Sequence, residues 1–215
     1  MSKTIHQIYS EYQIMPQLQL HQLRVAAVAY QLCLKIPHLH CNDVILACLL
    51  HDMGNIIKFD LGYFPDFTAP LGREYWQQVK SSFIQKYGPD EHLATLKIAE
   101  ELGLSTRAVD FIKSIGFSHT IENISPNILI EKKICAYADQ RVGPYGIISL
   151  NERLMDGKKR YSGLNEKDLK KYEEICSKLR VLEEQVLGMA KILPSDINDK
   201  PVSVYLENLR QTVLF

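Results

Sequence analysis

The feature that most constrains the fold of this chain is an apolar run, residues 44–50, that ends in the dipeptide His51-Asp52. A run of this kind indicates a buried helix, which carries an imidazole and a carboxylate to the edge of the protein core. Left unpaired there, these polar groups would cost several kcal/mol. A bound cation compensates both groups better than other partners do, so the dipeptide indicates a metal site.

Two further polar residues are embedded in apolar segments and could share this site. His21 lies thirty residues before His51 in a segment with helical apolar periodicity, and Asp139 ends another apolar segment. His21 by itself could be an ordinary core histidine. Asp139 could form a salt bridge to Arg141, although side chains at i and i+2 of a helix diverge. We predict a metal site with four ligands: His21, His51, Asp52 and Asp139.

Helical periodicity covers almost the whole chain, and no strand pattern of usable length is present. Residues 59–72 are too rich in Gly and Pro for regular structure and are expected to form a long aromatic loop, a type of segment that is often functional. Pro37 is expected to end the first helix, and Asn42 to cap the second. The sequence predicts an all-α fold with helices over 16–36, 43–53, 73–87, 90–102, 105–115, 126–141, 149–160, 165–193 and 201–212.

The last third of the chain has a different character. Residues 165–193 form one long amphipathic pattern, in which apolar residues recur at three- and four-residue steps and Glu183 interrupts the apolar seam. The seam could pack on the core of the same chain or on a second copy, which would make a homodimer through this helix. The basic cluster 158–160 is predicted to be a solvated helix face. We expect residues 143–215 to be a C-terminal helical extension packed on the core of a domain formed by 1–142.

Composition limits the partners and the compartment. The chain has 25 Lys and Arg residues against 25 Asp and Glu residues, so no overall field attracts nucleic acid or an acidic membrane. Its five cysteines form no CxxC motif, which suits a reducing compartment. The first residues lack the apolar core of a signal peptide, and no segment approaches the length of a membrane span. We therefore expect a cytoplasmic protein that contacts neither membrane nor nucleic acid.

The order His, His-Asp, Asp on an all-helical chain resembles the HD superfamily of metal-dependent phosphohydrolases. The segments 21–26, 49–54 and 136–139 carry this resemblance, which covers about residues 17–142 and does not extend to 143–215. It implies an HD-domain helical bundle that binds a divalent transition metal. Imidazole and carboxylate ligands without thiolate suit iron or manganese, and also nickel, cobalt or zinc, as one ion or two.

Two other histidines bear on the number of ions. His92 and His119 are the only histidines between residues 52 and 139, and each lies near an expected helix end. On the bare sequence each could be a surface or capping histidine. In binuclear HD proteins, however, two extra histidines fall between the His-Asp pair and the final Asp. The resemblance therefore implies that His92 and His119 hold a second metal ion.

Such a centre suggests a chemistry. Cations lower the pKa of bound water and so supply hydroxide at neutral pH, and a carboxylate such as Asp52 can bridge two ions. Basic side chains near the ligands would clamp the remaining phosphate charge, although each could instead be solvated or salt-bridged. We expect this role for three residues: Arg24, Lys58 and Arg141. Asn55 stands where mononuclear HD nucleotidases carry an acidic general acid or base, which leaves metal-bound hydroxide as the better nucleophile.

The expected function is hydrolysis of a phosphoester in a nucleotide or another small phosphorylated metabolite. The aromatic stretch that includes Tyr63, Phe64 and Phe67 could stack a base or simply pack in the core. Two alternatives stay open. A few HD proteins use the same six ligands to hold a mixed-valent di-iron centre that activates oxygen, so an oxygenase is the first. The second is a non-catalytic nucleotide sensor that signals through the helix over 165–193.

Overall fold

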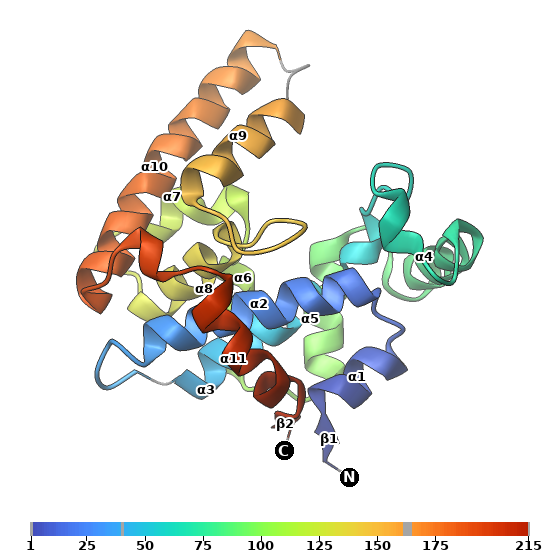
Figure 1. The fold of residues 1–215 in the computed structure, drawn as a ribbon. Helices are drawn as coiled ribbons and strands as arrows, with labels where there is room; N and C mark the ends of the chain where they lie inside the picture. The colour runs from blue at the N-terminus through green and yellow to red at the C-terminus, as the bar shows by residue number, and fades with distance from the viewer. Residues whose placement is uncertain (1, 40, 161–164, 215) are drawn as a thin grey trace.

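The computed structural model describes residues 2–39, 41–160 and 165–214, and this part of the chain is almost wholly helical (Figure 1). The expected all-α fold is confirmed. The α-helices are α1 (Ile5–Glu11), α2 (Pro16–Cys33), α3 (Cys41–Leu50), α4 (Arg73–Tyr87), α5 (Glu91–Glu101), α6 (Thr106–Ser114), α7 (Thr120–Asn123), α8 (Ile130–Gln140), α9 (Leu150–Arg160), α10 (Glu166–Ala190) and α11 (Asp199–Arg210). Four 3-10 helices connect them: η1 (Asn55–Ile57), η2 (Pro65–Thr68), η3 (Phe117–His119) and η4 (Pro194–Asp196).

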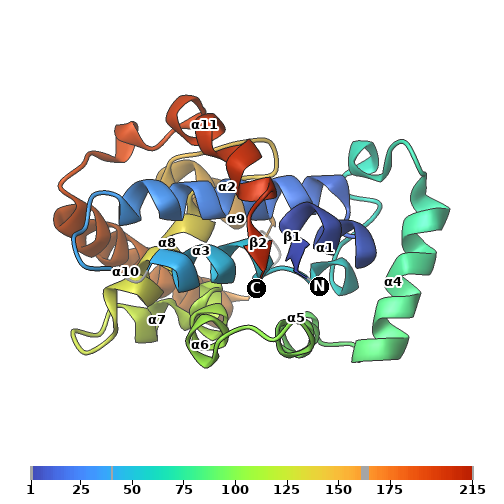
Figure 2. The ribbon, with the colours of Figure 1, turned by 90° about the horizontal axis from the view of Figure 1, so that it is seen from below.

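Helix α2 runs through the middle of the molecule, and α3, α8 and α11 all pack against it (Figures 1 and 2). Pro16 stands in the first turn of α2, where its missing N–H costs no hydrogen bond. Ala26, Ala27 and Ala29 are fully buried, and their small side chains let the neighbouring helices approach closely. Because α2 is central, the polar residues that it carries near its first turns lie next to α3 and α8.

Several element boundaries differ from the sequence expectation. α3 begins at Cys41, so Asn42 lies in its first turn and is not its cap. α2 ends at Cys33, before Pro37, and α8 begins at Ile130. The expected loop 59–72 contains the short helix η2. Boundaries move in this way because end residues take their hydrogen bonds from whatever packs beside them.

A small antiparallel sheet joins the two ends of the described chain. Strand β1 (Lys3–Thr4) pairs with β2 (Val213–Leu214), with Lys3 opposite Leu214 and Thr4 opposite Val213. Both termini therefore lie close together (Figure 2). Strands of two residues carry no recognisable period, which is why the sequence analysis missed this sheet.

Helices α9 and α10, which we call the arm, lie side by side and project from the core (Figure 1). The apolar seam of α10 packs on α7 and α8 of the same chain. Glu183, which interrupts the seam, accepts a 2.7 Å hydrogen bond from the Tyr137 hydroxyl on α8. The seam therefore packs on the core of its own chain, which is one of the two packing modes expected from the sequence. A homodimer through this helix stays a prediction.

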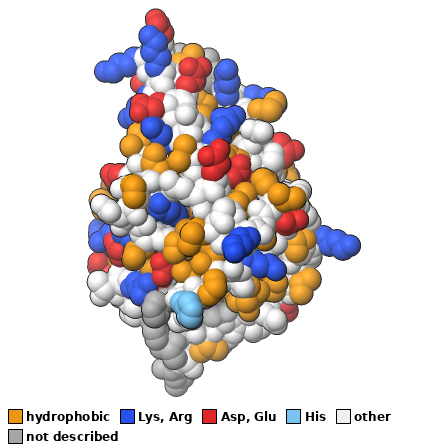
Figure 3. Space-filling view, turned by 90° about the vertical axis from the view of Figure 1, so that its left-hand side faces the viewer, with side chains coloured by type: hydrophobic (Ala, Val, Ile, Leu, Met, Phe, Trp, Pro, Cys, Tyr) orange, Lys and Arg blue, Asp and Glu red, His pale blue; other side chains and the backbone are white. Residues whose placement is uncertain are grey.

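The outer surface on this side of the molecule is mixed in character. Positive and negative side chains alternate with hydrophobic ones, and charges of both signs gather at its upper end, where the arm lies (Figure 3). Lys158 and Lys159 are exposed, as expected for a solvated face, whereas the side chain of Arg160 lies outside the described residues. Within the described ranges, no helix combines the length and the apolar composition that crossing a membrane requires.

Candidate metal centre

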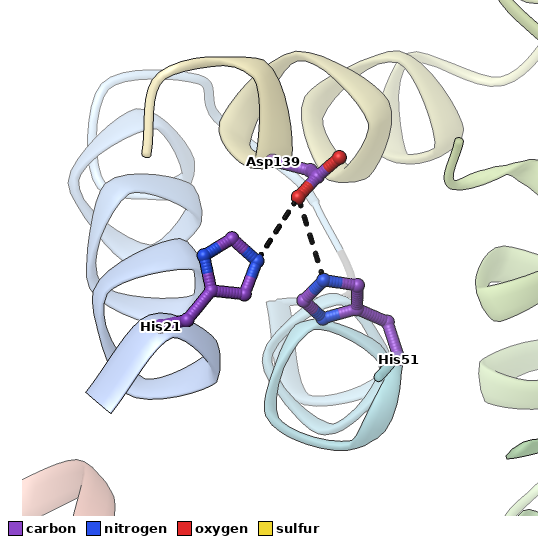
Figure 4. Close-up of side chains that lie close together, drawn as sticks. All are labelled: His21, His51 and Asp139. Atoms are coloured by element: carbon purple, nitrogen blue, oxygen red, sulfur yellow. Dashed lines mark ion pairs between the residues drawn. The ribbon is translucent and has the colours of Figure 1, made fainter. Parts of the chain in front are cut away.

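Three side chains from different parts of the chain converge at one point (Figure 4). His21 comes from α2, His51 directly follows α3, and Asp139 lies near the end of α8. Their ligand atoms all lie within 4.8 Å of one another. One Asp139 oxygen, Oδ1, is 3.2 Å from His21 Nε2 and 3.5 Å from His51 Nε2. This is an arrangement in which a single cation could contact all three residues.

The ring of His51 is oriented by its own helix. Its Nδ1 lies 2.8 Å from the carbonyl oxygen of Cys48, to which it donates a hydrogen bond. When the ring is neutral, this hydrogen bond leaves the lone pair on Nε2, which faces Asp139. Among the described residues this buried Nε2 has no hydrogen-bond partner. A histidine held by a backbone carbonyl, with its second nitrogen unpartnered beside a carboxylate, fits a metal ligand.

Asp52 lies beside these three residues. Its Oδ2 is 3.6 Å from His21 Nε2 and 3.7 Å from His51 Nε2, and the same oxygen accepts a hydrogen bond from the Asn55 side-chain amide. The Asp52 backbone N–H donates to Gln22 Oε1 at 3.1 Å, so the chain turns here and α3 stops at Leu50. The turn brings together two adjacent side chains that a continuing helix would separate.

The electrostatics of the cluster favour a bound cation. Burial by itself would lower the pKa of His51, but the carboxylates of Asp52 and Asp139 raise that pKa to about 9. Burial would raise the pKa of Asp139, but the imidazoles of His21 and His51 beside it hold that pKa well below its usual value. Burial would also raise the pKa of Asp52, but His51 and His21 lower it. Two ionised carboxylates thus lie in a largely buried place, where positive charge is needed to balance them. A divalent cation fits the donors and the charge.

The two expected second-metal histidines face one another. His92 lies in the first turn of α5, which Asp90 caps, and His119 ends η3. Their ring centroids are 6.0 Å apart. Burial and the neighbouring His119 lower the pKa of His92, which favours the neutral form that can bind a metal. Both histidines line the cavity that also contains His21, but neither belongs to the tight cluster with Asp139.

The basic residues expected to clamp a phosphate occupy different places. Lys58 lines the cavity, and its ammonium group is 3.0 Å from Glu91 Oε1. Arg24 lies away from the cavity lining, with its Nε 4.0 Å from a carboxylate oxygen of Asp199 on α11. Lys58 therefore remains a candidate for phosphate binding. The guanidinium of Arg24 faces Asp199 on α11, and its role in phosphate binding stays a prediction.

Arg141 faces the protein interior and is not among the residues that line the cavity. It is 2% exposed, and its guanidinium donates to the Tyr137 hydroxyl and to the backbone carbonyl oxygens of Ile148, Pro194 and Ile197 at 2.7–3.0 Å. Four of the five guanidinium N–H donors thus bind protein oxygens, and the fifth lies in a buried place. Arg141 instead ties α8 to the C-terminal extension.

The cavity beside the cluster has a volume of about 1140 Å³ and two kinds of wall. One is aromatic, since Phe59, Phe64 and Phe67 line it and the last two rings stack with centroids 4.8 Å apart. The other includes Arg153 and Lys171 of the arm, neither of which the sequence predicts to lie beside the metal ligands. The positions of Arg153 and Lys171 relative to the buried residues of α9 and α10 indicate which helix face carries them. These positions do not indicate which cavity that face lines.

The comparisons with known proteins agree with this geometry. The family model of the HD domain matches residues 19–141, which is more than half of the chain and contains all six candidate metal ligands. No curated protein and no solved structure shows significant similarity to the chain. The extent of the family match, together with the convergence of His21, His51 and Asp139, shows that this chain belongs to the HD domain family.

Proposed function

We propose that the protein is a metal-dependent phosphohydrolase that cleaves a phosphoester of a nucleotide or a similar small metabolite. The observation that carries the proposal is the buried, unpartnered Nε2 of His51 beside the carboxylate of Asp139. His21, His51, Asp52 and Asp139 would hold the first ion. His92 and His119 would hold a second, since both line the same cavity.

The chemistry divides between the ion and the chain. A divalent transition metal bound by these residues would lower the pKa of a coordinated water and so supply the nucleophile for hydrolysis. Asn55 donates a hydrogen bond to Asp52 and so orients that carboxylate. Lys58 carries a positive charge into the cavity, where it could bind a phosphoryl oxygen. Its pKa is raised because the carboxylates of Asp52 and Glu91 outweigh the effect of burial.

The size and lining of the cavity favour a nucleotide as the substrate over a smaller phosphoester. Its volume of about 1140 Å³ exceeds the range of about 300–1,000 Å³ that small-molecule sites usually occupy. Phe59 and Phe64 line it and are only half-buried, and Tyr63 beside them is 57% exposed. Half-buried aromatic rings on a cavity wall provide surfaces on which a base can stack.

The metal part of the proposal is tested by elemental analysis of the purified protein. We expect about one to two equivalents of iron, manganese or a related metal in the wild type. A His51→Ala, Asp52→Ala double variant should lose most of it while keeping its helical circular dichroism. Equal metal content in the two proteins would contradict the proposed site.

The hydrolytic part is tested by measuring phosphate release from nucleoside monophosphates, nucleoside diphosphates and dinucleotides in the presence of manganese, iron or nickel. We expect turnover of at least one compound at about 1 per second or faster, abolished in Asp52→Ala. The paired histidines also suit a di-iron oxygenase, for which oxygen uptake and the paramagnetic resonance signal of a coupled iron pair would appear without phosphate release. Tight nucleotide binding without either reaction would indicate a sensor.

A further inference from the structure

The arm contributes a wall to the cavity that contains the metal cluster. Arg153, Leu154 and Gly157 line it from α9, and Asp168, Lys171, Tyr172 and Ile175 line it from α10. Within each helix these residues recur at steps of one, three or four positions, so they share one face of the helix. All of them lie beyond residue 141, where the match to the HD domain ends. The cavity is therefore built partly from a segment to which the family assigns no role.

Packing fixes this wall relative to the metal residues. The ring of Tyr172, which is buried, stacks on Phe117 with centroids 5.4 Å apart, and Phe117 is two residues before His119. The Tyr172 hydroxyl donates to the Leu154 carbonyl oxygen at 2.7 Å, which joins α10 to α9. Gly157 makes room for the ring, because a Cβ atom there would lie 2.5 Å from the Tyr172 hydroxyl oxygen.

Two cations on this wall stand without a counter-ion. Neither Arg153 nor Lys171 has an ion-pair partner among the residues that the structure describes. The adjacent Lys170, on the outer face, is paired with Glu166 at 2.9 Å. Asp168, the acidic residue on the same wall, accepts a 2.7 Å hydrogen bond from Asn165. The inward cations are thus the ones left available for a ligand.

We propose that Arg153 and Lys171 form an anion subsite that binds a second phosphoryl group of the substrate. The inference rests on the proposed function and narrows its substrate class to nucleotides with at least two phosphoryl groups. One group would lie at the metal cluster and another at the arm, with the base on the aromatic wall. Arginine suits this role because its planar guanidinium can donate two parallel hydrogen bonds to one phosphoryl group. The cavity volume accommodates such an extended ligand.

The test compares binding of AMP, ADP and adenosine 3′,5′-bisphosphate to the manganese-loaded protein by equilibrium dialysis. We expect the wild type to bind at least one of the two compounds that carry two phosphoryl groups about tenfold more tightly than AMP. An Arg153→Gln, Lys171→Gln double variant should lose this preference and keep the wild-type affinity for AMP. Lys159→Gln is the matched control, because Lys159 is exposed on the same helix as Arg153. It should retain the preference.

Four results would overturn the anion subsite. Three concern the compounds and the control: equal wild-type affinity for all three compounds, absence of binding by all three, or the same loss of preference in Lys159→Gln. The fourth is a loss of AMP affinity in the double variant equal to its loss of affinity for the compounds with two phosphoryl groups. Phosphate release, measured in parallel, keeps the two proposals separate. Phosphate release without a binding preference for a second phosphoryl group would contradict the anion subsite and support the phosphohydrolase. A binding preference without phosphate release would support the anion subsite and contradict the phosphohydrolase.

Discussion

Gly54 is the residue at which the turn carrying His51 and Asp52 meets α5. A Cβ atom at this position would lie 2.3 Å from the Glu91 carbonyl oxygen and 2.8 Å from the Ala94 Cβ atom. The Gly54 N–H also donates to the Thr95 hydroxyl at 2.9 Å. The absence of a side chain therefore lets α5 approach the metal-binding turn closely.

We expect Gly54→Ala to destabilise the protein by about 1–3 kcal/mol, because the methyl group would push α5 away from the turn. The matched control is Gly188→Ala in α10, where a Cβ atom would meet nothing within 4 Å. That change should stabilise the protein by about 0.5–1 kcal/mol, since glycine is unfavourable inside a helix. Urea unfolding measures both values. Equal effects of the two changes would show that the close approach at Gly54 is unimportant.

At the scale of elements, Glu101 joins three helices on one side of the site. Its carboxylate accepts hydrogen bonds from Tyr12 at the end of α1 (3.1 Å), and from Lys86 (3.3 Å) and Tyr87 (3.0 Å) on α4. Burial would raise the pKa of Glu101, but the hydrogen bonds from Tyr87, Lys86 and Tyr12 outweigh burial, so the pKa lies below its usual value. The ionised form is the one that holds these helices together.

This lowered pKa predicts a pH dependence of stability. Because the pKa is lower in the folded state, the stabilisation is present above the ordinary carboxyl pKa and is lost as the pH falls through the folded-state value. We expect Glu101→Gln to be less stable than wild type at pH 7 and to approach it in acid. Glu100→Gln, at an exposed neighbouring position, should follow the wild-type curve. Urea unfolding between about pH 7 and 3 would reveal parallel curves if Glu101 has no such role.

For the whole molecule, Arg141 and Glu183 connect the metal-binding bundle to the C-terminal extension. The Arg141 guanidinium binds carbonyl oxygens of Ile148, Pro194 and Ile197, and it lies 3.9 Å from Glu183 on α10. Arg141 is two residues after Asp139. The extension is thus anchored immediately beside one of the candidate metal ligands.

We expect Arg141→Leu to destabilise the protein by about 3–5 kcal/mol, because it leaves buried carbonyl oxygens without donors and breaks a buried charge pair. Arg24→Leu is the comparison, since Arg24 pairs with Asp199 only at 4.0 Å and at a largely exposed carboxylate. Its cost should stay below about 1 kcal/mol. Thermal and urea unfolding measure both. A cost for Arg141→Leu no greater than that of Arg24→Leu would refute the anchoring role.

Local patterns were sufficient to predict the helical fold and to single out His21, His51 and Asp139, which the structure brings together. The apolar periodicity around His21 and before Asp139 places these residues on buried helix faces, and it depends only on neighbours within a few turns. The capping residues Asp90 and Ser105 begin α5 and α6, since each side chain accepts a backbone N–H of its own helix. Where a hydrogen bond is local, the sequence determines it.

What only the tertiary structure decided depends on contacts between distant residues. α3 stops at Leu50 because N–H groups of the following turn are taken by Gln22 and Thr95, which belong to α2 and α5. In the sequence, Arg141 and Lys58 look equally suitable for binding a phosphate, because each is close to predicted metal ligands. In the structure, the Arg141 guanidinium binds backbone carbonyl oxygens of residues 148–197, whereas Lys58 lines the cavity. Arg153 and Lys171 reach that cavity because Tyr172 stacks on Phe117. Periodicity shows that a face is buried but not what it is buried against, and long-range packing alone supplies that information.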